Sequence, residues 1–403
     1  MQVELKAPLA TEPLAREAAS VIGRCVHCGF CNATCPTYQL RGDELDGPRG
    51  RLYLMKQLLE GKPAGEITRL HLDRCLTCRA CETACPSGVE YGRAVEATRE
   101  LLGQQLPRRA VGRWRRAALR TFLGSGTFSL ALAAGRLLRP WLPATLRRRI
   151  PLREPPGPWP VAVHARRVLV PRGCVQPAMF PRTDAALARI LERLGVSTVP
   201  IAGCCGSLRQ HLDDPAGAMA DVRANVDAWW PHVERGVEAI MMTASACGLQ
   251  VKDYGRLLSD DPAYAERAAR IAALARDPAE YLAGFAADLV RLSPMQDSRV
   301  AFHAPCTLQH GQRLGGSVEV LLTRLGAKPL PVADAQLCCG SAGAYSILQP
   351  EMSIRLRERK LRALTAGEPT EVLSANVGCI AHLAAGTDLR VRHWLEWLDE
   401  RCS

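Results

Sequence analysis

Two stretches with the same cysteine spacing decide the fold of the N-terminal part: Cys25–Pro36 reads CVHCGFCNATCP, and Cys75–Pro86 reads CLTCRACETACP. Each follows the pattern C-x2-C-x2-C-x3-C and closes on proline. Cysteine thiolates are the ligands of iron–sulfur clusters, and a [4Fe–4S] cube needs four sulfurs that converge from different directions. In this pattern the first three cysteines surround one cube and the fourth reaches the neighbouring cube. The repeat therefore predicts two such cubes.

Because the fourth cysteine of each block binds the cube of the other block, the eight cysteines divide into two sets of ligands. Set I consists of Cys25, Cys28, Cys31 and Cys85, and set II consists of Cys75, Cys78, Cys81 and Cys35. Pro36 and Pro86 lack an N–H and have a fixed φ, so each turns the chain just after the crossing ligand. Structural zinc is the alternative, but a zinc site leaves no role for the third and fourth cysteine of each block. The residues from about 20 to 90 resemble a bacterial dicluster ferredoxin.

Apolar residues recur at helical spacing between and after the two blocks. A stripe in Gly47–Gly61 predicts a core-packing helix that ends at the second glycine. The stripe consists of Leu52, Met55, Leu58 and Leu59. A second helix is predicted after Pro86 from the apolar residues Val89, Val95, Leu101 and Leu102.

The length and the cysteine content limit the class of protein. A chain of 403 residues suggests two or three domains. It has 17 cysteines and no visible secretory signal, which favours metal or redox chemistry over a disulfide scaffold. No run of eighteen apolar residues occurs, so no transmembrane span is predicted. We therefore expect a cytoplasmic protein.

The net charge of +12 is concentrated in one segment, since twelve arginines and no Asp or Glu lie between Pro107 and Arg153. The aromatic residues of residues 107–160 are Trp114, Phe122, Phe128, Trp141 and Trp159. They lie in helix-like runs and not on an exposed platform, so no nucleic-acid partner is expected. Two interpretations stay open. The segment forms basic amphipathic helices that dock on a partner or an anionic membrane, or it is a linker stiffened by proline.

The remaining cysteines form a second internal repeat. Set III consists of Cys174, Cys204, Cys205 and Cys247, and set IV consists of Cys306, Cys338, Cys339 and Cys379. Corresponding cysteines are 132 to 134 residues apart, and the adjacent pairs lie in AGCCGS (Ala202–Ser207) and QLCCGS (Gln336–Ser341). The stretches LERLGVSTVPI and LTRLGAKPLPV precede these pairs. Such matching indicates an internal duplication.

Short β-rich runs alternate with helical stretches in both copies. The runs are RVLVP, STVPI and EAIMMT in the first copy, and RVAFH, KPLPV and EVLS in the second. Strand–helix alternation predicts a mainly parallel sheet, with sets III and IV at the carboxyl ends of the strands. The predicted fold is therefore multidomain. It has a small α-helical dicluster ferredoxin-like domain (1–105), a basic helical bridge (106–160) and two α/β domains (161–295 and 296–403).

The two α/β copies resemble the CCG-domain family, which occurs in heterodisulfide reductases and in iron–sulfur subunits of 2-hydroxyacid and glycerol-3-phosphate oxidising complexes. Members have a lone cysteine, then CCG, then C-x2-C. Here Ala244 and Asn376 replace the first cysteine of that last element. Each copy thus offers four thiols where members that hold a non-cubane cluster offer five. We expect sets III and IV to bind one further cluster each, or only one of them to do so. The alternative is that they are small buried cysteines.

Three histidines lie near these cysteines. His303 and His310 flank Cys306, and His211 follows the first CCG. Each is a candidate to donate a hydrogen bond to a cluster sulfur or to carry a proton, and the alternative is an ordinary surface or core histidine. Cys402 belongs to no set and is expected to be incidental.

The chain has neither G-x-G-x-x-G after a strand nor a P-loop, so we expect no flavin or nicotinamide on it. Its full length, including GPRGRLYLMK and FHAPCTLQHG, resembles the iron–sulfur subunits of glycolate oxidase (glycolate dehydrogenase). The resemblance implies FAD-binding partner subunits that oxidise glycolate to glyoxylate, with electrons passing through this chain to a quinone or other membrane acceptor. It also implies a peripheral position on the inner face of the cell membrane.

Other functions compatible with the same parts are also considered. A subunit for lactate or glycerol-3-phosphate oxidation would contain the same cysteine sets. A CCG-type thiol–disulfide reductase is disfavoured by the two replaced cysteines, and no residue is predicted to be catalytic on this chain.

Overall fold

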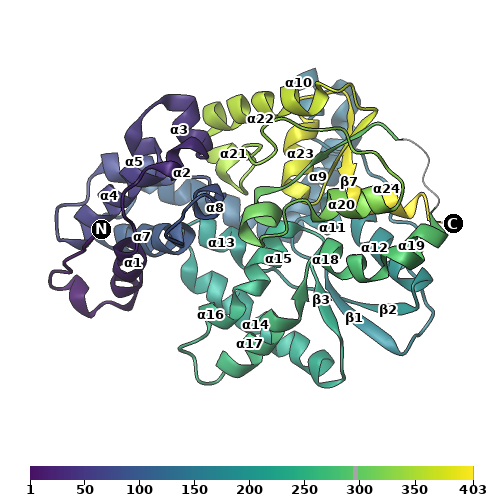
Figure 1. Cartoon of the computed structure of the whole chain (residues 1–403), viewed down its shortest axis with the longest axis horizontal. Coiled ribbons are helices and arrows are strands. Elements are labelled where there is room, and N and C mark those ends of the chain that lie inside the picture. The colour runs from purple at the N-terminus through teal and green to yellow at the C-terminus, as the bar shows by residue number, and fades with distance from the viewer. Residues whose placement is uncertain (294–297, 403) are drawn as a thin grey trace. The chain divides into compact units, whose positions relative to one another are not determined.

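The computed structural model describes residues 1–293 and 298–402, and the chain forms two compact units. Unit 1 comprises Met1–Arg116 and Gln336–Lys360, and unit 2 comprises Ala117–Ala335 and Leu361–Ser403. Figure 1 labels the elements of both units. The boundary predicted at residue 295 between the two α/β domains lies outside the described residues. The other predicted domain limits stay predictions.

Unit 1 is helical. Its N-terminal part contains η1 (Leu9–Thr11), α1 (Pro13–Gly23), α2 (Phe30–Ala33), α3 (Pro36–Arg41), η2 (Glu44–Asp46), α4 (Pro48–Leu59), α5 (Glu66–Asp73), α6 (Ala80–Thr83) and α7 (Tyr91–Gln105). The two predicted helices are confirmed as α4 and α7, and the stripe residues of α4 are buried. Pro48 suits the first position of α4 because its φ is helical and no N–H is needed there. The core of the unit lies between α1, α4 and α7.

The second segment of unit 1, Gln336–Lys360, comes from far along the chain. It contains α21 (Tyr345–Leu348) and most of α22 (Pro350–Thr365). The Tyr345 hydroxyl donates a hydrogen bond to the carbonyl of Arg74 (3.2 Å), and Arg359 Nη1 donates one to Gln39 Oε1 (2.6 Å). The sequence did not predict this association, because nothing in the pattern of either segment records which distant surface it covers.

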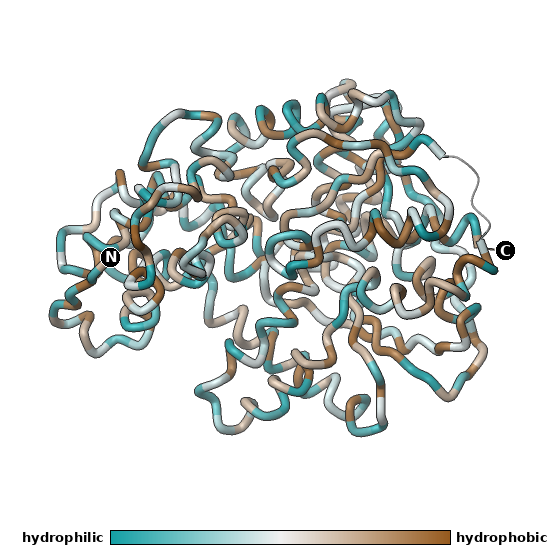
Figure 2. The backbone as a smooth tube through the Cα atoms, viewed as in Figure 1, coloured by the Kyte–Doolittle hydropathy of each residue, from teal (hydrophilic) through white to brown (hydrophobic). Residues whose placement is uncertain are grey.

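The first sheet of unit 2 has four parallel strands in the order β2-β1-β3-β4. The strands are β1 (Arg166–Pro171), β2 (Val196–Ile201), β3 (Ala239–Met241) and β4 (Ala275–Arg276). The helices of this part are α11 (Gln176–Met179), α12 (Arg182–Arg193), α13 (Ser207–His211), α14 (Pro215–Glu234), α15 (Ser245–Lys252), α16 (Tyr254–Leu257) and α17 (Ala265–Leu274). In the central strand β1, Val168, Leu169 and Val170 have no exposed surface, as a parallel strand covered on both faces requires. Figure 2 shows β1 and β3 as hydrophobic segments.

The second sheet of unit 2 has three parallel strands in the order β5-β6-β7. The strands are β5 (Val300–His303), β6 (Glu371–Ser374) and β7 (Arg390–His393). The surrounding elements are α18 (Pro278–Leu282), η4 (Ala283–Phe285), α19 (Ala286–Leu292), the π-helical turn η5 (Thr307–Gly311), α20 (Ser317–Arg324), α23 (Val377–Ala384) and α24 (Trp394–Asp399). The two sheets confirm the predicted α/β architecture with parallel strands.

The strand predicted at KPLPV is wrong. Within this run only Leu330 pairs, through an isolated bridge to Ala301 in which its N–H donates to the Val300 carbonyl (2.8 Å). Pro329 and Pro331 have no N–H, and since the Leu330 N–H is directed at β5, they leave the opposite edge of the run without donors.

The basic segment contains α8 (Ala110–Gly124), α9 (Gly126–Leu138), η3 (Arg139–Trp141) and α10 (Ala144–Arg147), and residues 151–164 form neither helix nor strand. Within the described part of the chain, no helix combines the length and the apolar character that a membrane span needs. Along α9 and η3 the side chains of Leu130, Leu137 and Trp141 are all more than 70% exposed, at 72%, 74% and 77%. Exposed apolar residues therefore lie close in the sequence to two half-buried arginines, Arg136 and Arg139, on this part of unit 2.

Candidate iron–sulfur centres

The four cysteines of set I line one pocket in unit 1, together with Gly29, Arg49 and Tyr91. Burial and the nearby thiols of Cys25, Cys85 and Cys28 together raise the pKa of Cys31 to about 11. The pocket thus brings the crossing residue of the second block to the three cysteines of the first block. The thiol of Cys81 also reaches its lining.

Set II forms the matching group. Burial raises the pKa of Cys81 well above its ordinary value, and the thiols of Cys78, Cys75 and Cys35 lie close enough to add to this shift. Cys35, the crossing residue of the first block, therefore lies with the three cysteines of the second block. Each set therefore contains three cysteines of one block and the fourth cysteine of the other block, as predicted. That these cysteines bind a cluster stays a prediction.

The two cysteine loops have the same backbone geometry. The N–H of His27 donates to Cys25 Sγ (3.3 Å), and the N–H of Thr77 donates to Cys75 Sγ (3.4 Å). Both donor residues adopt a positive φ, of 60° and 51°, so the loop curls around the sulfur. Hydrogen bonds from N–H groups to sulfur are the outer contacts that stabilise a cluster's thiolates. The donor set and this backbone fit a [4Fe–4S] cube at each site.

The two loops differ in exposure. In the first loop Val26 and Phe30 are 68% and 66% exposed, and Cys28 is exposed as well. The corresponding residues of the second loop, Leu76 and Ala80, are buried. Set I is therefore the end of the pair that lies at the surface of unit 1, and set II is the inner end.

Set III lies where the sequence predicts it, at the carboxyl ends of the first sheet. Cys174 follows β1, Cys204 and Cys205 follow β2, and Cys247 lies in the first turn of α15, which follows β3. These strands are neighbours in the sheet, so the loops that follow them meet at one edge.

The thiols of set III form a continuous chain of contacts from Cys174 through Cys204 and Cys205 to Cys247. Hydrogen bonds from Cys174 and Cys205 lower the pKa of Cys204 to about 3, and the Gly206 N–H and the nearby charge of Arg209 act in the same direction. The thiolate is the form that binds iron. Set III therefore has the geometry and the electrostatics of a soft-metal site.

Two residues that the sequence analysis missed hold the CCG loop of set III. Asn225 Nδ2 donates to the Cys204 carbonyl (2.6 Å), and the Tyr254 hydroxyl donates to the Cys205 carbonyl (3.2 Å). Gly203 lies so close to this amide that an added Cβ would be 2.3 Å from Asn225 Oδ1. Neither supporting residue lies in a motif, so no signal in a single sequence identifies them.

Set IV is divided between the two units. In unit 2, Cys306 lies just after β5 and Cys379 lies on α23, where Asn376 Nδ2 donates a hydrogen bond to Cys379 Sγ (3.3 Å). Asn376 thus contacts the sulfur from the position where CCG-domain relatives have a cysteine. Cys338 and Cys339 are buried in the segment that folds with unit 1, and the Gly340 N–H donates to Cys338 Sγ (3.4 Å).

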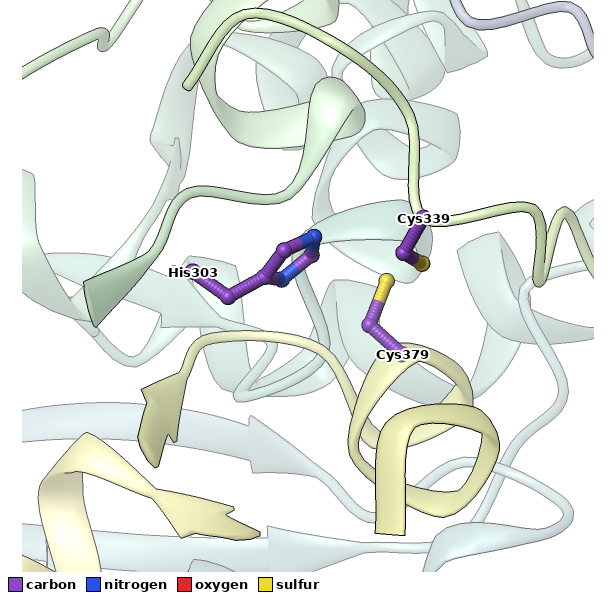
Figure 3. Close-up of side chains that lie close together, drawn as sticks. All are labelled: His303, Cys339 and Cys379. Atoms are coloured by element: carbon purple, nitrogen blue, oxygen red, sulfur yellow. The ribbon is translucent and has the colours of Figure 1, made fainter. Parts of the chain in front are cut away.

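The three candidate histidines have different surroundings. His303 ends β5, is buried, and shares a hydrogen bond between Nδ1 and Ser374 Oγ (2.9 Å). A ring nitrogen of His303 lies within 4.8 Å of Cys379 Sγ, and Figure 3 shows the ring directed toward that side chain. His310 is buried, and His211 is half-buried at the end of α13. Cys402 packs into the hydrophobic core of unit 2, away from sets III and IV in the sequence.

Comparison with known families supports the division of the chain into one dicluster region and two later cysteine-rich copies. Residues 21–89 match the 4Fe-4S dicluster domain family, and residues 168–252 and 300–384 match the cysteine-rich domain family. These ranges contain all the cysteines of sets I to IV. The chain is thus an iron–sulfur protein in which a dicluster domain with 4Fe–4S cofactors precedes two cysteine-rich domains.

Individual proteins with similar sequences identify the class of iron–sulfur protein more closely. The glycolate oxidase iron-sulfur subunit of Escherichia coli (strain K12) is 46% identical over 404 residues, which is 99% of each chain. A probable glycolate oxidase iron-sulfur subunit of Bacillus subtilis (strain 168) is 29% identical over 90% of this chain and 88% of its own. Lactate utilization protein A of Geobacillus thermodenitrificans is 25% identical, over 57% of this chain and 96% of its own. The chain belongs to the family of glycolate oxidase iron–sulfur subunits, and its dicluster domain is an electron-transfer domain.

Proposed function

We propose that this chain is the electron-transfer subunit of a glycolate-oxidising complex. FAD-binding partner subunits would oxidise glycolate to glyoxylate, and electrons would pass through this chain to a quinone or another membrane acceptor. The observation that carries the proposal is the relative with 46% identity along the full length, together with two four-thiol groups in one domain. The lactate utilization relative covers only 57% of this chain, which favours glycolate over lactate.

The chemistry of the proposal is one-electron storage, which [4Fe–4S] clusters supply when bound. The chain's own residues would hold each cube through four thiolates and shield it with N–H donors to sulfur. The exposed side chains of Val26 and Phe30 beside set I favour this end as the one that exchanges electrons with another subunit. The buried set II would then be the inner relay.

We further propose that set III binds an additional iron–sulfur cluster, because its four thiols already converge. Set IV would bind another one by the internal repeat, since both copies match the same domain family. The missing fifth cysteines at Ala244 and Asn376 disfavour a thiol–disulfide reductase of the heterodisulfide type. In this proposal the chain is organised as a dicluster domain, a basic bridge and two CCG domains, within the limits predicted from the sequence.

The replacement Cys28→Ser in the assembled complex tests the electron-transfer role. It should abolish turnover with the final acceptor while glycolate still reduces the flavin of the partner subunit, as followed by stopped-flow absorbance. The matched control is Cys402→Ala, which removes a thiol outside every set and should leave both steps unchanged. Equal loss of flavin reduction and acceptor turnover in Cys28→Ser would count against a separate electron-transfer subunit.

We also propose that the basic segment of unit 2 holds the complex peripherally on the inner face of the cell membrane. Exposed Leu137 and Trp141 lie close in the sequence to the exposed arginines Arg147, Arg148 and Arg149, and such a combination suits an anionic lipid surface. Changing the three arginines to glutamine should release the complex into the supernatant of fractionated membranes.

The control for the membrane experiment makes the same change in charge elsewhere on unit 2. The exposed residues Arg235, Arg270 and Arg291 are suitable. Unchanged fractionation after replacement of Arg147–Arg149 would support a linker role for the segment instead.

A further inference from the structure

Arg51 is a buried cation in the middle of the dicluster domain. It lies on α4 and is 1% exposed. Its Nε donates to the His71 carbonyl (2.7 Å), and its Nη2 donates to Thr37 Oγ1 (3.1 Å) and lies 3.5 Å from Asp46 Oδ1. A buried charge is costly unless nearby groups compensate it, so its presence here requires a reason. A cluster with four thiolate ligands does not need an arginine for its coordination.

The group around Arg51 contains more cations than anions. Asp46, with no exposed surface, contacts four basic side chains, which are Arg41 (2.9 Å), Arg51 (3.5 Å), Arg74 (3.1 Å) and His71 (2.9 Å). A carboxylate oxygen of Asp43 lies within 4.8 Å of one of Asp46 and of a ring nitrogen of His71. Three guanidinium groups thus face two carboxylates, which leaves a net positive charge even when His71 is neutral.

This positive charge lies beside set II. Thr37 Oγ1, which accepts from Arg51 and donates to the Asp46 carbonyl (2.7 Å), lies 3.2 Å from Cys35 Sγ, so one hydroxyl lies between the guanidinium and a predicted ligand sulfur. Burial alone would lower the pKa of Arg51, yet its pKa is raised because the thiolates of Cys75 and Cys35 and the carboxylate of Asp46 lie close. The guanidinium is therefore within electrostatic reach of two ligands of the same set.

Set I has different surroundings. The arginine that lines its pocket is Arg49, whose Nε forms an ion pair with Glu44 (2.6 Å). Asn32 Nδ2 also donates to this carboxylate (2.9 Å). One guanidinium with one carboxylate contributes little net charge. The two predicted cubes thus have unlike electrostatic environments within one domain.

We propose that Arg51 raises the reduction potential of the cluster at set II and is a positioning residue for its sulfur ligands. Reduction transfers one electron from the reduced neighbouring cube, which is thereby oxidised, and no bond or proton is exchanged. The cube that accepts the electron becomes more negative by one unit. Burial disfavours this added charge, and the fixed positive charge of Arg51 offsets the effect. The inference rests on the proposed electron-transfer role, since it assumes clusters at sets I and II.

The test is a redox titration of the full chain purified without air, followed by electron paramagnetic resonance at low temperature. In Arg51→Met, at a fixed solution potential near the wild-type midpoint, the reduced-to-oxidised ratio of one cluster should fall at least tenfold. This fall corresponds to a shift of the midpoint by about 59 mV to lower values for one electron. The other cluster should keep its midpoint, and Cys28→Ser, which alters set I, identifies which signal is which.

Two further variants distinguish an effect of the Arg51 charge on the midpoint potential from an effect of the mutation on folding. Arg51→Lys keeps the positive charge and should recover most of the midpoint. Arg16→Met removes an exposed arginine of α1 in the same unit and should change neither cluster. If Arg51→Met loses its iron, Thr37→Val is titrated in its place. This nearly isosteric change removes the hydroxyl that accepts from Arg51, donates to the Asp46 carbonyl and lies beside Cys35 Sγ, and it should shift the same cluster downward by a smaller amount.

Each result has a distinct meaning. Iron-loaded Arg51→Met, or Thr37→Val in its place, with both midpoints unchanged would overturn the inference and leave the proposed function standing. A wild-type chain with no cluster signal after reduction would instead overturn the proposed function itself. Equal shifts of both clusters would also contradict the inference, because the surplus of guanidinium groups over carboxylates around Asp46 lies beside set II.

Discussion

Gly206 illustrates how single residues shape the centres. It follows Cys205 and adopts a φ of +87°, a conformation that a side chain disfavours. An added Cβ would lie 2.9 Å from the carbonyl oxygen of Ala218 on α14. The glycine of the CCG motif therefore lets the loop turn its N–H toward Cys204 while the backbone of a helix passes close by.

The replacement Gly206→Ala should destabilise the protein more than Gly236→Ala does. Gly236 has a similar φ of +80°, but a Cβ added there would meet no atom within 4 Å, so this position isolates the cost of the backbone conformation. That cost is about 1–2 kcal/mol. Gly206→Ala should add the cost of displacing Ala218. Thermal denaturation measures the difference, and equal midpoints for the two variants would contradict this account.

Glu396 makes stability depend on pH. Its pKa is raised to about 7, chiefly by burial and also by the Glu154 carboxylate, and the Thr183 hydroxyl, Arg182 and Arg392 offset part of this increase. A raised pKa means that the folded state holds the proton more tightly than the unfolded state. The stabilisation is fully present below about pH 4.3, the ordinary value for Glu, and is lost as the pH rises through about 7.

The replacement Glu396→Gln should remove this pH dependence, because an amide has no proton to lose. Relative to wild type, the variant should gain on the order of 3 kcal/mol between pH 4 and pH 8. The measurement is the denaturation midpoint as a function of pH for both proteins. Glu266→Gln, at an exposed position on α17, is the control. A constant difference between Glu396→Gln and wild type across this range would refute the assignment.

At the scale of elements, α4 shows what periodicity can and cannot predict. Its apolar stripe predicted the helix and its buried face correctly, since burial follows from the 3.6-residue period. The same helix places Arg49 beside set I and Arg51 beside set II, and nothing in the sequence distinguishes these two arginines. Their partners, Glu44 and Asp46, come from the preceding turn, and only the fold determines which arginine is buried with excess positive charge.

The replacement Leu59→Ala should cost about 2–5 kcal/mol, because Leu59 has no exposed surface and its loss leaves a cavity between packed helices. Leu70→Ala on α5 removes the same atoms from a residue that is 43% exposed and should cost clearly less. Denaturation of the two variants, followed by the helical signal, compares them. Similar losses would show that the core of unit 1 does not lie where the structure places it.

The error at KPLPV has a physical reason at the same scale. The run is apolar at alternate positions, which favours a strand, but a ladder also needs an N–H at every second residue. The Leu330 N–H is the donor that reaches the Val300 carbonyl, so prolines at 329 and 331 leave the opposite edge of the run without donors. The edge strand β2 tolerates Pro200 because it pairs with β1 alone. A proline in a short β-rich run thus restricts pairing to one edge, and the structure contains both outcomes, a full strand at β2 and a single bridge at Leu330.

At the scale of the whole chain, spacing predicts groups of cysteines for a different reason in each part, and cluster binding by each group stays a prediction. The eight residues of sets I and II follow from the geometry of a cube. Set III follows from the rule that loops at the carboxyl ends of parallel strands meet. The supporting groups Asn225, Tyr254 and Arg51 could not be predicted, because each acts through a contact between distant segments.

The iron content of the purified chain should exceed that of a dicluster protein. Each cube holds four irons, so sets I and II account for about eight, a cluster at set III raises the total to about twelve, and one at set IV raises it to about sixteen. Cys204→Ala should lower the total by about four and leave the two dicluster resonance signals in place. A wild-type chain with about eight irons, unchanged by Cys204→Ala, would show that set III binds no cluster.

Unit 1 is built from two segments that lie far apart in the sequence, and this affects the order in which it can fold during synthesis. The carbonyl of Arg74 lies next to Cys75, and its hydroxyl partner Tyr345 is synthesised 271 residues later. A ribosome that has completed only the N-terminal ferredoxin-like region has therefore not yet supplied all the chain that packs around it. Maturation of the inner cube would be completed only after most of the polypeptide has emerged. We therefore expect the dicluster region, expressed without Gln336–Lys360, to lack part of the packing of unit 1.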